Sequence, residues 1–80
     1  MPHKLLIRGL TMVAIMEDEG YYVARIRGSH YIMEKILPTG NVNIVHVPVH
    51  RHRYLAPGTL RAILQRASIE RTRLVEWLQG

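Results

Sequence analysis

The histidine at position 30 is the side chain in this sequence that is best placed to do chemistry. It follows Gly28 and Ser29, and arginines stand nearby at positions 25 and 27. An imidazole has an ordinary pKa of about 6.5, so it can take up and release protons near neutral pH. Guanidinium groups bind phosphate oxygens. Together these side chains predict proton transfer on a polyanion, with the arginines stabilising negative charge.

Cleavage of RNA without a metal ion is a reaction that such a set could carry out. The 2′-hydroxyl must lose a proton as it attacks the phosphorus, and the 5′-oxygen must gain one as it leaves. One imidazole can serve both steps if cations stabilise the phosphorane-like charge, and Arg25 and Arg27 are candidates for that role. Spacing alone also allows a simpler interpretation, in which His30 is a solvent-facing residue that merely pairs across a sheet.

Three further histidines, His46, His50 and His52, have spacings that a metal site could use. The chain contains no cysteine, and no carboxylate lies close in sequence to complete a ligand shell. Arg51 and Arg53 alternate with these histidines and would repel a cation. We therefore expect neither a metal nor another cofactor. His46 could be an accessory proton carrier or simply exposed, and His50 could orient a loop or touch RNA.

The distribution of charge favours a polyanionic partner. The net charge is +5, and between residues 20 and 67 seven Lys and Arg residues stand against a single acidic one, Glu34. Nucleic acid is the first candidate and an acidic protein the second, although an ordinary solvated basic surface explains the charge about equally well. Arg53, Arg61 and Arg66 could contact phosphate. Tyr21, or Tyr54 in a basic loop, could stack on an unpaired base.

Length and composition limit the class of protein. With 80 residues, one domain over residues 1–80 is expected, too small to enclose a large active-site cavity, so chemistry would take place on the surface. Apolar residues make up 48% of the chain, as in folded domains. The longest apolar stretch, residues 10–16, is too short to span a bilayer, and no secretion signal is visible. A cytoplasmic location away from membranes is expected.

Two strands joined by a tight turn are expected around His30. Residues 21–27 and 30–37 are rich in aromatic and β-branched residues. The Gly28-Ser29 pair between them suits a two-residue hairpin turn with glycine first, which pairs Arg27 with His30.

This pairing divides the residues of the two strands between two faces of a sheet. The more polar face is expected to be open to solvent and the more apolar face to be the core. The open face should carry Tyr21, Val23, Arg25, Arg27, His30, Ile32 and Glu34. The core face should carry Tyr22, Ala24, Ile26, Tyr31, Met33 and Lys35. A slip of one residue would reverse the assignment.

Helices are expected before and after the sheet. Residues 4–19 have apolar residues at helical spacing. A third strand over residues 42–49 should point Val45, Val47 and Val49 inward and His46 outward. A helix should open at residues 57–59, and Ser68 can cap a final segment. The apolar residues of that segment suit a core, but they could also form a homodimer contact: Leu74, Val75, Trp77 and Leu78.

The expected fold is therefore α+β. The order α-β-β-β-α looks like the double-stranded-RNA-binding-domain fold, with a three-stranded antiparallel sheet, helices on one face and a C-terminal helical extension.

Two segments of the chain resemble the HicA family of toxins. Residues 25–32 resemble its strand-turn-strand motif, R-Q-x-G-S-H-x-x-[FY]. Residues 47–50 and 55–67 resemble its strand-to-helix segment, V-P-x-H followed by L-x-x-G-T-L-x-x-I-L. The two motifs occur in the right order, and the resemblance covers nearly all of residues 4–69. The chain departs from the family at Ile26, often Gln, at Tyr31, often His, and at Ser68, usually Gly.

The resemblance implies an mRNA interferase, a toxin-type endoribonuclease that cleaves mRNA and arrests growth. It also implies neutralisation by a HicB-type antitoxin and a catalytic role for His30. The other residues expected at the RNA are Arg25, Arg27, Ser29, His46, His50, Arg53, Tyr54 and Arg61. Two alternatives stay open: a non-catalytic RNA-binding module with this fold, and a degenerate toxin that persists as an interaction protein.

Overall fold

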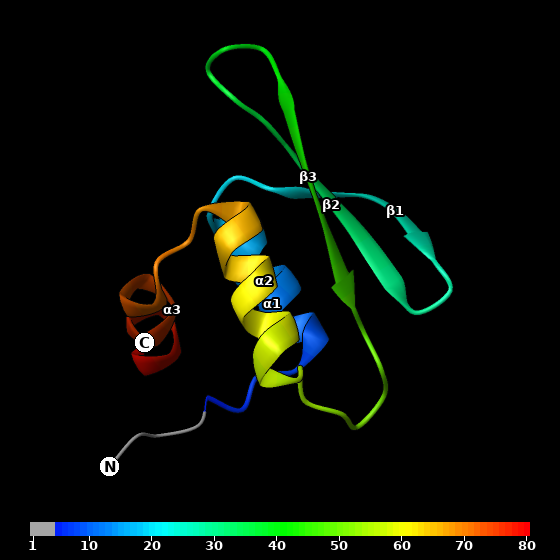
Figure 1. The fold of residues 1–80 in the computed structure, drawn as a ribbon, viewed down its shortest axis with the longest axis vertical. Helices are drawn as coiled ribbons and strands as arrows, with labels where there is room; N and C mark the ends of the chain where they lie inside the picture. The colour runs from blue at the N-terminus through cyan, green and yellow to red at the C-terminus, as the bar shows by residue number, and fades with distance from the viewer. Residues whose placement is uncertain (1–4) are drawn as a thin grey trace.

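Within residues 5–80, three helices and a three-stranded antiparallel sheet make up the fold. A computed structural model describes residues 5–80, and Figure 1 shows their arrangement. In chain order the elements are α1 (Gly9–Asp18), β1 (Tyr22–Arg27), β2 (His30–Ile36), β3 (Val42–Pro48), α2 (Pro57–Ala67) and α3 (Arg71–Gln79). The strands lie in the order β1-β2-β3, so β2 is central and β3 is an edge strand. The predicted α+β fold with a C-terminal helix is confirmed.

Helices α1 and α2 lie on one side of the sheet, and α3 lies on their far side (Figure 1). The core fills the space between these layers, and Met12, Met33 and Leu74 are fully buried in it. The inward direction predicted for the third strand is confirmed, because Val45 and Val47 are buried. Within residues 5–80, no helix is both long and apolar enough to cross a membrane.

The hairpin turn that presents His30 forms as predicted. Arg27 pairs with His30, and Gly28 takes a φ of 59° while Ser29 keeps a negative φ. A positive φ at the first central residue alone is the pattern of a type II′ turn, whose twist matches that of the flanking strands. The N–H of Val49 donates a 2.6 Å hydrogen bond to the carbonyl of Ser29. The turn is therefore tied to the chain that leaves β3.

Strand β1 contains an irregularity at Ala24 that the alternation pattern did not predict. Arg25 pairs with Ile32 and Val23 pairs with Met33, so one residue of β1 has no counterpart on β2. Such a β-bulge reverses the facing of every residue before it. Arg25 keeps its predicted place on the open face, whereas Val23 faces the core.

The predicted facing of the start of this strand is therefore wrong for three residues. Tyr22 lies on the open face, and Val23 packs against the core instead. Tyr21 is buried, so it cannot stack on a base. Its hydroxyl donates to the carbonyl of Ala67 at 3.2 Å and accepts a 2.7 Å hydrogen bond from the Asn43 amide. These bonds join the start of β1 and β3 to the end of α2.

Helix α1 begins later than predicted, at Gly9; the expected start at Lys4 lies outside the described residues. Arg8, just before the helix, is extended and forms a bridge with Tyr54, and the carbonyl of Ile7 accepts a 2.7 Å hydrogen bond from the N–H of Leu55. A Cβ at Gly9 would lie 2.9 Å from the Cα of Val49. Glycine therefore lets the helix start against the end of β3.

Ser68 ends α2 rather than beginning α3, so its predicted capping role is wrong. It adopts the left-handed conformation, with φ 56° and ψ 40°, and Glu70 is the N-cap of α3. The N–H of Ile69 donates to the carbonyl of Leu64 at 2.9 Å, which satisfies the end of α2. A left-handed residue at this place explains why glycine is usual here in the family that the sequence resembles.

Helix α3 is held against α1 by charge as well as by burial. The guanidinium of Arg73 donates to Glu19 at 3.1 Å and lies 3.9 Å from Asp18. The hydrogen bond to Glu19 raises the pKa of Arg73. Leu74 beside it is fully buried, whereas Leu78 is exposed. The acidic end of α1 therefore serves to dock the last helix.

We predict that Ser68→Gly stabilises the protein. A Cβ in the left-handed region costs roughly 1–2 kcal/mol, and the greater freedom of glycine in the unfolded chain offsets part of this. The net gain should be about 0.5–1 kcal/mol, which raises the thermal midpoint by a few degrees. Thermal unfolding followed by circular dichroism measures it. Ser68→Ala keeps the Cβ and is the control, and equal midpoints for the two variants would refute the prediction.

Candidate functional site

The open face of the sheet brings His30 together with the basic residues that the sequence singled out. Arg27 of β1 and Pro48 of β3 stand directly opposite His30 on its two sides. Arg25 and His46 are its diagonal neighbours, and residues in such positions are about 7–8 Å apart. An exposed imidazole is thus surrounded on one surface by two guanidinium groups and a second imidazole.

The middle of this surface is apolar. Ile32 pairs with Arg25 on one side and His46 on the other, so its side chain points to the open face. It is nevertheless only 4% exposed, and it lies apart from the main core. Neighbouring side chains of the open face therefore cover it.

The guanidinium groups of this face are available to an anion. Among residues 5–80, the only ion pairs are those of Arg73 on the far side of the helices. Glu34 is the carboxylate of the open face, and it accepts a 3.2 Å hydrogen bond from the hydroxyl of Tyr22. Loss of solvent raises the pKa of Tyr22, and the hydrogen bond to Glu34 adds to the rise. Glu34 is thus engaged with a phenol that stays protonated.

The loop after β3 places two further predicted residues beside Pro48, the partner of His30. His50 and Arg53 line a hollow of about 220 Å³, which we call the loop hollow. Pro48, the partner of His30 across the sheet, lines it too. Tyr54 also lines it, but its ring is engaged by the guanidinium of Arg8, 4.7 Å from the ring centre. His50 and Arg53 therefore share a hollow with the residue that pairs with His30.

Arg61 and Ser29 lie in surroundings other than the open face. Arg61 of α2 lines a separate hollow with Leu5, Leu6 and Arg71, which includes neither His30 nor His46. Ser29 is half-buried in the hairpin turn, where its carbonyl is engaged by the chain after β3. Within residues 5–80, no three His, Cys, Asp or Glu side chains gather closely enough to hold a metal ion.

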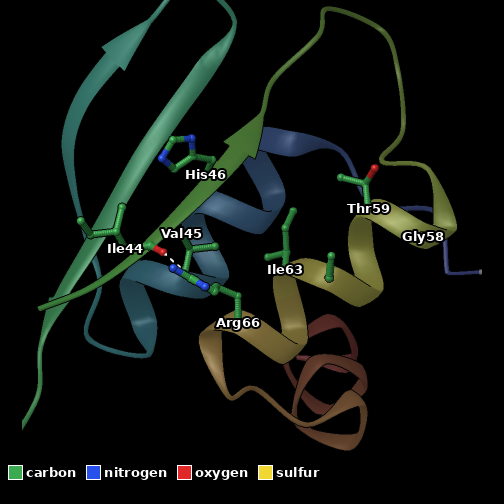
Figure 2. A pocket seen from close by; sticks show the side chains of 8 residues that line it. Ile44, Val45, His46, Gly58, Thr59, Ile63 and Arg66 are labelled. Atoms are coloured by element: carbon green, nitrogen blue, oxygen red, sulfur yellow. Dashed lines mark hydrogen bonds between the residues drawn. The ribbon is translucent and has the colours of Figure 1, made fainter.

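A groove between the edge strand β3 and helix α2 is the feature that the sequence did not reveal. It has a volume of about 570 Å³ and lies between Ile44, Val45 and His46 on β3 and Thr59, Ala62 and Arg66 on α2 (Figure 2). We call it the β3–α2 groove. It arises from packing between segments far apart in the sequence. The sequence signals for this surface were the outward position of His46 and the candidate phosphate contact Arg66.

Comparison with known proteins gives one family. The model of the family described as HicA toxin of bacterial toxin-antitoxin matches residues 11–69 of the 80-residue chain. No curated protein and no solved structure gives a significant match.

Proposed function

Because the chain belongs to the HicA toxin family, a group of toxins from bacterial toxin–antitoxin pairs, we propose that it cleaves mRNA with His30 as the acid–base group. The observation that carries this proposal is the pairing of His30 with Arg27 on an open, carboxylate-poor face of the sheet. An exposed imidazole beside an unpaired guanidinium suits a reaction at a phosphodiester, whose charge grows in the transition state.

The proposed mechanism needs no metal ion. Neutral His30 takes the proton of the 2′-hydroxyl while that oxygen attacks the phosphorus. As the bond from phosphorus to the 5′-oxygen breaks, the imidazolium returns the proton to the leaving oxygen. The products are a 2′,3′-cyclic phosphate and a 5′-hydroxyl. Arg27 and Arg25 stabilise the charge on the non-bridging oxygens, and His46, a diagonal neighbour of His30, lies on the same face.

The partners follow from the family and from the charge. The chain is the toxin of a pair, so an antitoxin protein is its natural partner. We propose that this antitoxin is of the HicB type and covers the open face, which blocks His30 and neutralises the arginines beside it. The substrate, mRNA, places the activity in the cytoplasm.

Incubation of the purified protein with single-stranded RNA in the presence of a chelator tests this function. The expected result is fragmentation that chelator does not prevent, and a duplex of the same sequence should be cut much more slowly. A protein that binds RNA but yields no fragments would instead be a non-catalytic RNA-binding module, which the α-β-β-β-α fold also suits.

A further inference from the structure

We propose that the β3–α2 groove binds unpaired nucleotides of the RNA next to the phosphate that is cleaved. The inference rests on the proposed function, because it names the part of the substrate that the nuclease holds. The groove joins the surface around His30 in two ways. His46 stands at its rim as a diagonal neighbour of His30, and Thr59 lines both the groove and the loop hollow. A strand of RNA at His30 can therefore continue into it.

The walls of the groove suit the bases of a nucleic acid. Its sides and floor are largely apolar, formed by Ile44 and Val45 of β3 and by Ala62 and Ile63 of α2 (Figure 2). An aromatic base gains free energy when it leaves water for such a surface, whatever its sequence. His46 also lines the groove, and its imidazole points from β3 over the sheet, away from α2 (Figure 2). A volume of about 570 Å³ is within the range of small-ligand sites.

The charges around the groove suit the backbone of the same strand. Arg66 lies at one end, and His50 and Arg53 line the loop hollow beyond the other end. Among the described residues that line the two hollows, none is acidic. A path that is basic at both ends and apolar between them fits a single strand, whose bases are free to turn inward. A duplex keeps its bases stacked inside and cannot fill such a groove.

The edge of β3 favours a nucleotide over an added protein strand. The Nε–H of Arg66 donates a 3.2 Å hydrogen bond to the carbonyl of Ile44, which occupies an acceptor that a partner strand would need (Figure 2). In an antiparallel ladder the N–H and C=O of His46 point the same way as those of Ile44. The N–H and C=O of His46 are therefore placed beside the groove for the edge of a base.

Ala62→Phe fills the groove and tests the proposal. Ala62 is exposed on α2, so a larger side chain there leaves the core unchanged. Gln65→Phe is the matched control, because Gln65 is exposed on the same helix but lines neither hollow. Both are made in a His30→Ala background, so that the RNA stays intact. The probe is a fluorescent single-stranded oligoribonucleotide of mixed sequence, and its Kd is measured by anisotropy.

We expect Ala62→Phe to raise the Kd for the single strand about tenfold, the effect of losing one stacked base, and Gln65→Phe to change it less than twofold. Binding of the matching duplex should be the same for both variants. Equal Kd values for the two variants with the single strand would overturn the proposal. The Ala62→Phe variant with His30 intact distinguishes another occupant. If it cleaved RNA at the parental rate but were no longer inhibited by the antitoxin, the groove would bind the antitoxin and not RNA.

This test is separate from the test of catalysis. If the groove does not bind RNA but the protein is a nuclease, the parent protein still cuts RNA while the two phenylalanine variants bind it equally. If the protein is not a nuclease, the protein with His30 intact makes no fragments, whether or not Ala62→Phe weakens binding.

Discussion

Replacement of His30 by alanine should lower the rate of RNA cleavage by at least about a thousandfold and abolish growth arrest. General acid–base catalysis by one side chain contributes about 10²–10⁴ to a rate, and here one imidazole carries both proton transfers. His30 is exposed, and it contributes to the hairpin through its backbone. The variant should therefore fold normally, as far-ultraviolet circular dichroism can verify.

His30→Gln and His52→Asn make this prediction specific. Glutamine keeps a polar side chain of similar length but cannot carry a proton at neutral pH, so it should be as inactive as alanine. His52 is an exposed loop histidine with a φ of 62°, a conformation that asparagine tolerates. His52→Asn should cleave RNA like the parent. Catalysis by His30 would be refuted if His52→Asn lost as much cleavage activity as His30→Ala. It would also be refuted if His30→Ala retained more than a tenth of the parental rate.

Arg27→Gln should slow the chemical step about a hundredfold. Arg27 stands directly across the sheet from His30, and removal of one donor to a developing negative charge typically costs 10²–10³ in rate. The single-turnover rate at saturating RNA measures this step apart from binding. The rate for Arg27→Lys should lie between the rates for the parent and for Arg27→Gln. An ammonium keeps the charge but cannot bind two phosphate oxygens in a fixed fork.

Arg71→Gln is the matched control for this experiment. It removes the same charge from an exposed arginine of α3, behind the helices and far from the open face. If Arg27 only attracted RNA through its charge, Arg71→Gln and Arg27→Gln would weaken RNA binding to the same extent. The single-turnover cleavage rate at saturating RNA would then stay unchanged in both variants. A saturated rate for Arg27→Gln within threefold of the parental rate would show that Arg27 has no part in the chemical step.

The parts of the fold that depend on local signals could be predicted. The Gly28-Ser29 turn set the pairing of Arg27 with His30, and alternation placed Val45 inward and His46 outward. Local spacing at residues 57–60 likewise marked the start of α2. These signals suffice because a tight turn fixes the register of a hairpin, and one residue pair fixes the facing of the others.

The errors occurred where distant segments override local pattern. The bulge at Ala24 accompanies the burial of Tyr21 and its hydrogen bond to α2, which no periodicity in β1 reveals. The apolar residues before Gly9 have helical spacing, but the bridge between Arg8 and Tyr54 and the hydrogen bond from Leu55 to Ile7 tie this segment to the chain before α2. Ser68 resembles a helix cap in the sequence, yet the chain needs a left-handed residue there to end α2.

In the candidate site, too, local patterns could be predicted from the sequence and contacts between distant segments could not. Its histidine and arginines lie on one hairpin and one neighbouring strand, so their grouping could be predicted from register. The β3–α2 groove could not, because it depends on how closely α2 packs beside β3, and Ile44 and Ala62 are ordinary residues in the sequence.

The chemical nature of the RNA ends tests the central claim most directly. We predict that the parent protein, incubated with a single-stranded RNA in chelator, leaves a 2′,3′-cyclic phosphate on one fragment and a 5′-hydroxyl on the other, as mass spectrometry of the products would show. Substitution of the 2′-hydroxyl by 2′-O-methyl at the cleavage site should prevent the cut. Fragments with a 5′-phosphate and a 3′-hydroxyl, formed only when divalent metal is added, would contradict attack by the 2′-oxygen and with it the role of His30.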